Sequence, residues 1–148
     1  MIGVEFSDYN LLLMQQILDR HPNVVVMSGN DDVLLPALSI GAHGVIGLTL
    51  NFMPSLYAQL YEAFEGGDLN TARHLQYKAN RLIRIVIQYG AGGIVALKPL
   101  MKWLGFDCGS PRAPLPALDQ ASMDHMNQQL TQIDFFTDPI YCGWAKDR

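Results

Sequence analysis

The chain has 148 residues, enough for one ordinary domain, and its 49% hydrophobic and 16% charged residues are typical of a folded globular protein rather than a disordered one. Its 10 Lys and Arg residues are outnumbered by 14 Asp and Glu residues, and the basic residues form no block that could follow a phosphate backbone. The apolar runs are shorter than the roughly 20 residues that span a bilayer. This composition predicts no nucleic-acid partner and no membrane span.

The cysteines and histidines show no pattern that is typical of a metal centre. Cys108 and Cys142 are far apart, with no second Cys or His at metal-ligand spacing. Of the four histidines, His43 begins a predicted strand, and the other three lie on or beside predicted helices without an acidic partner at a useful spacing. No charged segment followed by a short apolar segment opens the chain as a signal peptide would. We therefore expect two free thiols, a cytoplasmic protein, and no metal or other cofactor.

Short strands alternate with helices in the first part of the chain. The predicted strands cover residues 1–6, 24–27 and 43–47. The predicted helices run from a cap at Ser7 or Asp8 to about His21, and from Leu34 to Ile40. The β-branched run at 24–27 is typical of a parallel strand that is buried on both faces. A βαβαβ order predicts an α/β fold with a parallel sheet.

Only helices are predicted after Asn51. They run from Pro54 to about Phe64, from a cap at Asp68 to Ile87, from Ile94 to Leu104, and from about Asp119 to Ile133. We expect residues 91–93 to break the pattern, the helix from Ile94 to bend or restart at Pro99, and residues 110–116 to form a proline-rich connector. Residues 134–148 show no period and stay unassigned. The sequence thus predicts two parts, residues 1–66 and residues 67–148.

Three parallel strands are too few to close a barrel, and an unpaired strand edge invites pairing. We therefore expect a fragment or a component of an assembly, either a homo-oligomer or a complex with a complementary barrel half. Because ligands bind at the carboxyl ends of parallel strands, the informative loops are 5–8, 29–32 and 48–51.

These loops carry a family resemblance. Residues 3–8, Gly-Val-Glu-Phe-Ser-Asp, resemble the Gly-Ile/Leu-Lys-x-Ser/Thr segment of the N-acetylneuraminate (sialic acid) lyase and dihydrodipicolinate synthase family of pyruvate-dependent class I aldolases. Residues 28–32, Ser-Gly-Asn-Asp-Asp, resemble its Gly-x-Asp-Glu loop, and residues 41–49 resemble its Gly-Ala-x-Gly-x-Ile-Gly-Ser-Thr strand. Residues 65–72, 96–98 and 111–115 match later elements in the same order.

The resemblance implies that the chain forms the C-terminal portion of a TIM (β/α)8 barrel, about three strands, followed by a helical region. Phe6-Ser7-Asp8 and residues 136–138 are closer to the sialic acid lyase branch than to the lysine-biosynthetic branch, which remains the alternative. The implied substrates are pyruvate and sialic-acid-like sugar acids.

The resemblance also implies roles for six residues. Glu5 stands at the position of the lysine that forms a Schiff base with the keto acid, and a carboxylate forms none. The positions that contact the hydroxylated part of the substrate are Ser7, Gly29, Asp31, Asp32 and Leu48, where Leu48 replaces a serine. Asp31 and Asp32 could instead cap the helix that follows them.

Three hypotheses follow for the function. The chain is a truncated or degenerate aldolase that is inactive alone, or one half of a barrel that a separate polypeptide completes. The third possibility is a non-catalytic binding or regulatory module that pairs with itself or with a full-length paralogue.

Overall fold

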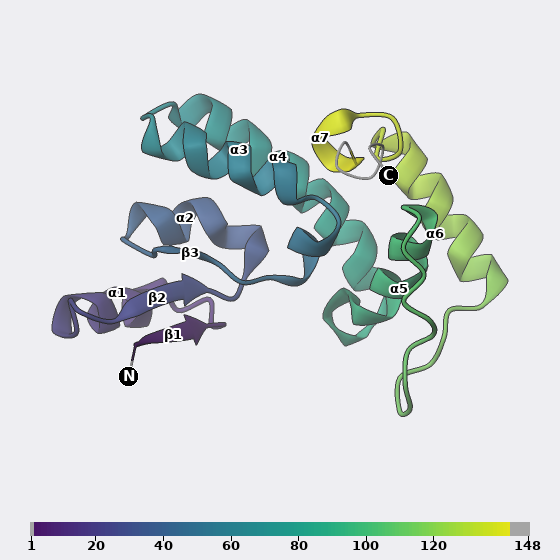
Figure 1. Ribbon diagram of the computed structural model, residues 1–148, viewed down its shortest axis with the longest axis horizontal. Coiled ribbons are helices and arrows are strands. Elements are labelled where there is room, and N and C mark those ends of the chain that lie inside the picture. The colour runs from purple at the N-terminus through teal and green to yellow at the C-terminus, as the bar shows by residue number, and fades with distance from the viewer. Residues whose placement is uncertain (1, 143–148) are drawn as a thin grey trace.

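The computed structural model describes residues 2–142, so Met1 and the last six residues of the unassigned tail lie outside the part described below. A three-stranded parallel sheet lies at one end of the molecule, and helices form the rest (Figure 1). The strands are β1 (Gly3–Phe6), β2 (Val25–Ser28) and β3 (Gly44–Val45), in the order β1-β2-β3. The predicted parallel sheet is confirmed, although β3 is shorter than expected and β2 begins one residue later.

Helices α1 (Leu11–Arg20) and α2 (Leu34–Ser39) cover one face of this sheet. A small core joins Phe6 and Val26 of the strands to Met14 of α1 and Ala37 of α2. The neighbouring Val25 points the other way and is 40% exposed. The expectation that this strand is buried on both faces is therefore wrong, because the described helices pack against only one of them.

The cap of α1 also differs from the prediction. Asn10, rather than Ser7 or Asp8, accepts a hydrogen bond from the Leu13 N–H at 3.0 Å. Asp8 instead accepts one from the Asn10 N–H at 2.8 Å, which forms a turn before the helix. Ser7 is thereby left at the end of β1, outside the helix.

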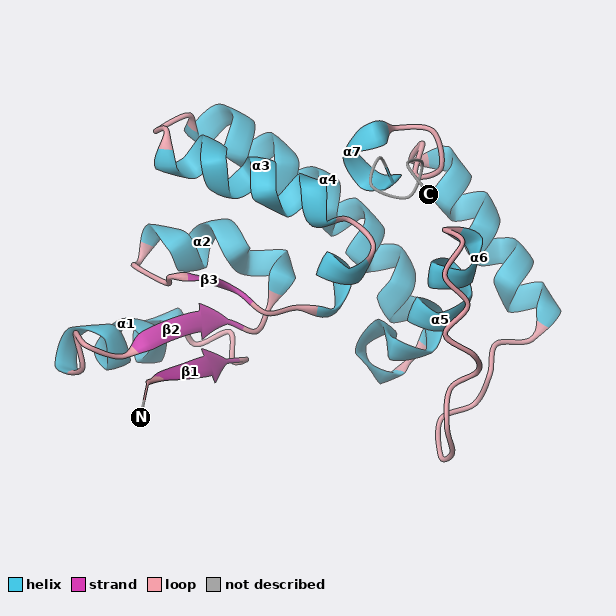
Figure 2. Ribbon diagram, viewed as in Figure 1, coloured by secondary structure: helices cyan, strands magenta, loops and turns pink. Residues whose placement is uncertain are grey.

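Helices make up most of the chain after β3 (Figure 2), and buried residues of these helices, with Leu34 and Leu38 of α2, form a second, larger core. Its helices are α3 (Pro54–Glu65), α4 (Leu69–Val86), α5 (Ile94–Trp103), α6 (Gln120–Gln132) and α7 (Pro139–Cys142). Short 3-10 turns connect elements at η1 (Asp31–Val33), η2 (Leu48–Asn51), η3 (Ile87–Tyr89) and η4 (Ala91–Gly93). Phe135 is fully buried and makes edge-to-face contact with Phe52, with ring centroids 6.5 Å apart. Within residues 2–142, no helix combines the length and hydropathy that crossing a membrane requires.

Most of the predicted helix signals are confirmed. Asp68 caps α4 through the Thr71 N–H at 3.0 Å, and Asp119 caps α6 through the Ser122 N–H at 2.8 Å. The predicted break falls at η4, where Gly92 has a φ of 62° that favours glycine. Helix α5 does not restart at Pro99, however, because Val95, Ala96 and Leu100 are buried on both sides of it and hold the helix together.

The unassigned tail contains α7, which is attached to α4 by one cluster of contacts. Lys78 forms an ion pair with Asp138, and its Nζ lies 5.4 Å from the centre of the Tyr141 ring. The Tyr141 hydroxyl donates to the Lys78 carbonyl at 3.0 Å, and burial raises the pKa of Tyr141 to about 12. Both cysteines are free, as predicted.

Loss of the Asp138 carboxylate should loosen α7. Burial disfavours ionisation of Asp138, but the hydrogen bonds from Lys78 and the Ile140 N–H, with the charge of Lys78, outweigh it and hold its pKa below the ordinary 3.8. Such a group stabilises the fold above its unfolded pKa, and this contribution is lost as the pH falls through the folded pKa. We predict that Asp138→Asn lowers the free energy of unfolding by about 1 kcal/mol at neutral pH.

Urea denaturation at neutral pH and below pH 3.8 measures this effect, which should shrink in acid. The matched control is Asp107→Asn, which breaks the exposed pair with Lys102 and should cost less. Equal losses in the two variants, or a loss at Asp138 that persists unchanged in acid, would contradict the prediction.

Candidate functional site

A pocket of about 270 Å³ lies at the carboxyl ends of the strands. Four of the predicted site residues line it, namely Gly29, Asp31, Asp32 and Leu48. The remaining wall was not predicted from the sequence. The β1–α1 loop contributes Tyr9 to it, and the end of α4 and the following turn contribute Ile83, Val86 and Ile87. The parallel strands therefore direct their loops to one edge, as the βα pattern predicted.

Glu5 and Ser7 lie at the end of β1, beside the pocket loop. Glu5 is exposed, and the Ser7 hydroxyl donates to its Oε1 at 3.3 Å. A Cβ atom at Gly29 would overlap Ser7 Oγ and would lie 3.0 Å from Glu5 Oε1. Only glycine at this position allows the ends of β1 and β2 to approach so closely, and Gly29 N–H also donates to the Phe6 carbonyl at 2.8 Å.

The Asp31 carboxylate points to the next loop of the sheet. Its Oδ2 accepts from the Thr49 N–H at 2.8 Å and from the Thr49 hydroxyl, which in turn lies 2.6 Å from the hydroxyl of buried Tyr57. A Cβ at Gly47 would lie 2.6 Å from Asp31 Cγ, so a glycine leaves room for this carboxylate. Burial, and then the charge of Asp31, raise the pKa of Tyr57 well above 10.0. Asp31 thus joins the loops after β2 and β3 through its hydrogen bonds with Thr49. The Tyr57 hydroxyl at the end of this network keeps its proton.

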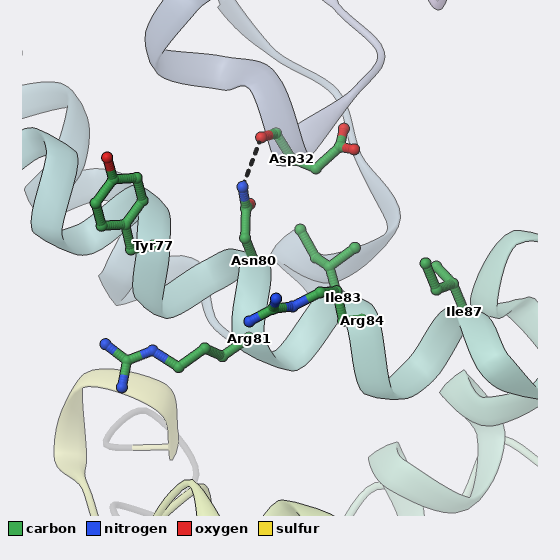
Figure 3. Close-up of a pocket in the computed structure, with 7 residues that line it drawn as sticks. All are labelled: Asp32, Tyr77, Asn80, Arg81, Ile83, Arg84 and Ile87. Carbon is green, nitrogen blue, oxygen red and sulfur yellow. Dashed lines mark hydrogen bonds between the residues drawn. The ribbon is translucent and has the colours of Figure 1, made fainter.

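The Asp32 carboxylate takes a different direction. Its Oδ2 accepts from the Tyr9 hydroxyl at 2.9 Å, and its main-chain carbonyl accepts from Asn80 of α4 at 3.0 Å. Figure 3 shows the carboxylate on the side of the residue away from this carbonyl. Neither η1 nor α2 has a side-chain cap, so the expectation that Asp31 and Asp32 cap the following helix is wrong, although both do lie in the first turn of η1. Both carboxylates bond to other loops instead.

Two amide side chains of α4 hold the main chain of this loop. Gln76 is buried and donates to the Asp31 carbonyl at 3.0 Å and to Asn80 Oδ1 at 2.9 Å, while its Oε1 accepts from the Leu35 N–H at 2.9 Å. Asn80 then reaches the carbonyl of Asp32. Because buried amides need partners, two amides one turn apart on an amphipathic helix, beside its buried apolar residues, are the signal that could have pointed to this contact.

A larger groove of about 590 Å³ lies on the other side of Asp32, along α4. Figure 3 shows its polar side chains, which include Tyr77, Arg81 and Arg84 on successive turns of the helix. The groove shares Asp32, Ile83 and Ile87 with the pocket. Asp32 therefore stands at the boundary between the two hollows.

The pocket offers oxygen acceptors but no amine. No lysine lines it, and within residues 2–142 no group of His, Cys, Asp and Glu side chains is placed to bind a metal together. His43 accepts a hydrogen bond from the Val26 N–H at 3.1 Å and begins the approach to β3, away from the strand ends that form the pocket. Carboxylates that accept hydrogen bonds suit the hydroxyl groups of a polyhydroxylated ligand.

Known proteins resemble this chain over most of its length. Residues 1–133 match the model of the dihydrodipicolinate synthetase family. Human N-acetylneuraminate lyase is 35% identical over 141 residues, which cover 92% of this chain and 44% of that enzyme. The 4-hydroxy-tetrahydrodipicolinate synthase of Methanopyrus kandleri is 28% identical over 133 residues, or 89% of this chain and 44% of that enzyme.

A solved structure agrees with these relatives. The N-acetylneuraminate lyase of Fusobacterium nucleatum, in complex with pyruvate, superposes with a TM-score of 0.82 at 26% identity, over 90% of this chain and 45% of that one. The chain therefore spans less than half the length of the relatives it matches. With the family match over 133 of its 148 residues, this chain belongs to the dihydrodipicolinate synthetase family, which it shares with N-acetylneuraminate lyase-like aldolases.

Proposed function

We propose that the chain is the C-terminal part of a lyase-like (β/α)8 barrel that binds the hydroxylated portion of a sugar acid but forms no Schiff base at position 5. One observation carries this proposal. Glu5 presents an exposed carboxylate at the end of β1, where the family resemblance requires a lysine amine. The chain alone is thus a binding module and not a carbon–carbon lyase.

The chemistry of the replacement supports the loss of catalysis. A neutral lysine amine attacks the keto carbon, loses water and becomes an iminium, whose positive charge accepts the electron pair of the broken carbon–carbon bond. Glu5 has no nitrogen to form that iminium. Its negative charge would also disfavour the electron-rich enamine that cleavage produces. Ser7 then serves to hold the Glu5 carboxylate, at 3.3 Å, rather than a catalytic amine.

The carboxylates of Asp31 and Asp32 can still accept hydrogen bonds from a ligand. Within the described residues, the hydrogen bonds to the Asp31 and Asp32 carboxylates all go to Oδ2, which leaves Oδ1 of each for a ligand hydroxyl. Leu48 offers an apolar surface where the sialic acid lyase branch has a serine. The pocket volume, about 270 Å³, is also slightly below the usual range for ligand-binding pockets, as expected for one wall of a larger site. We propose a keto sugar acid as the ligand class.

A second candidate function is pairing with further strands. Within residues 2–142, β1 and β3 each have one edge without a strand partner, and the sheet face that the described helices leave uncovered carries Val25. Ile46 and Ile2 are also exposed, at 50% and 89%. Free edges and exposed apolar side chains favour association with parallel strands from elsewhere in the polypeptide, from a complementary chain or from a second copy. In that assembly the chain contributes the sugar-binding loops.

Removal of the Asp32 charge should weaken ligand binding. We predict that Asp32→Asn lowers the affinity for N-acetylneuraminate about ten-fold, since a hydrogen bond to a charged group contributes on the order of 1.5 kcal/mol. Ligand-observed NMR titration of the full chain measures the effect. The matched control Asp19→Asn makes the same charge change on the exposed surface of α1 and should leave binding unaltered. Equal affinities in all three proteins, or no binding by the unaltered chain, would sink the proposal.

Restoration of the lysine alone should not restore catalysis. We predict that Glu5→Lys gives no measurable release of pyruvate from N-acetylneuraminate, because the open sheet does not enclose a substrate around the new amine. A coupled assay for pyruvate with the isolated variant tests this, with circular dichroism to verify that the variant is folded. Steady turnover by the folded variant would show that the described strands suffice for the reaction.

A further inference from the structure

Tyr9 occupies an unusual place for an exposed aromatic residue. It lies in the loop between β1 and α1 and is 64% exposed, yet its hydroxyl crosses to the next loop and donates to Asp32 Oδ2 at 2.9 Å. The same side chain lines the pocket that contains Gly29 and Leu48. Tyr9 therefore bonds to the pocket aspartate that the resemblance assigns to a ligand.

The Tyr9 hydroxyl remains a hydrogen-bond donor at neutral pH. Its hydrogen bond to Asp32, then partial burial and the charges of Asp32 and Asp31, raise the pKa of Tyr9 above 10.0. It therefore stays protonated throughout the neutral range, in which an ionised carboxylate only accepts. A phenol hydroxyl and a sugar hydroxyl make the same kind of hydrogen bond to Asp32.

We propose that Tyr9 is a specificity-determining residue, whose hydroxyl takes the place of a ligand hydroxyl at Asp32 Oδ2 and so favours short sugar acids over long ones. This inference rests on the proposed function. A long polyhydroxylated ligand whose hydroxyl approaches Asp32 Oδ2 from the direction that the Tyr9 hydroxyl occupies must displace Tyr9, whereas a short ligand that ends before Oδ2 leaves the Tyr9 bond intact.

The surrounding contacts support competition rather than positioning. The main chain of Asp32 is already held by Asn80, and that of Asp31 by Gln76, so the loop does not depend on Tyr9 for its place. A second residue of the same pocket supports this reading, because the Leu48 side chain has no hydroxyl with which to bind a ligand. Tyr9 and Leu48 thus each remove one polar contact from the same pocket.

The test is Tyr9→Phe, which removes only the hydroxyl of an exposed side chain. We expect the affinity of the full chain for N-acetylneuraminate to rise about two- to ten-fold, as one neutral or charge-assisted hydrogen bond is freed. The affinity for the shorter 2-keto-3-deoxygluconate should stay unchanged. Ligand-observed NMR titrations with both compounds give the two affinities, and Tyr61→Phe, at a partly exposed tyrosine of α3, is the matched control.

A double-variant comparison ties the effect to Asp32. In an Asp32→Asn background, Tyr9→Phe should no longer raise the affinity for N-acetylneuraminate, because the carboxylate for which Tyr9 and the ligand compete is absent. Weaker or unchanged binding of N-acetylneuraminate by Tyr9→Phe, or an equal gain for both compounds, would overturn the inference while the proposed function stands. If neither compound binds the unaltered chain or the variant, the proposed function fails, and this inference fails with it.

Discussion

The contact between Asp31 and Thr49 holds the loops at the carboxyl ends of β2 and β3 together, and the shape of the pocket depends on it. The Thr49 N–H and hydroxyl both donate to one carboxylate oxygen, and the buried Tyr57 hydroxyl extends the network into the helical core. Charge-assisted bonds of this kind are stronger than neutral ones, particularly where water is largely excluded. Because Gln76 and Asn80 fix the same loop from α4, the sheet and the helical region position the pocket jointly.

This network gives the two aspartates different roles. Asp31 is mainly a structural residue, since its carboxylate closes a bond between loops, whereas Asp32 faces outward between the pocket and the groove along α4. Glu5 lies exposed at the end of β1, and we propose that it stands where the family resemblance places the lysine. In the function that we propose, the loops after β2 and β3 bind the ligand, no Schiff base forms at position 5, and the Tyr9 hydroxyl occupies one acceptor of Asp32.

Much of the fold follows from local signals in the sequence. The alternation of strands and helices predicted the parallel sheet. Asp68 and Asp119 were predicted as helix caps because each short carboxylate directly precedes a helical apolar repeat, where it can accept a hydrogen bond from a main-chain N–H of the first turn. The same rule failed for Asp8, Asp31 and Asp32. At these positions the carboxylate has partners elsewhere, at Asn10, Thr49 and Tyr9, two of which are distant in sequence. Tertiary partners of this kind leave no periodic signal, which also explains why the α4 wall of the pocket was missed.

The central claim is that the chain binds its ligand without a covalent bond to its own residues. Intact-mass spectrometry of the unaltered chain after incubation with pyruvate and borohydride tests it most directly, because reduction makes any Schiff base permanent. We expect an unchanged mass. A pyruvate-derived adduct that peptide mapping assigns to a lysine of this chain would show that a Schiff base does form.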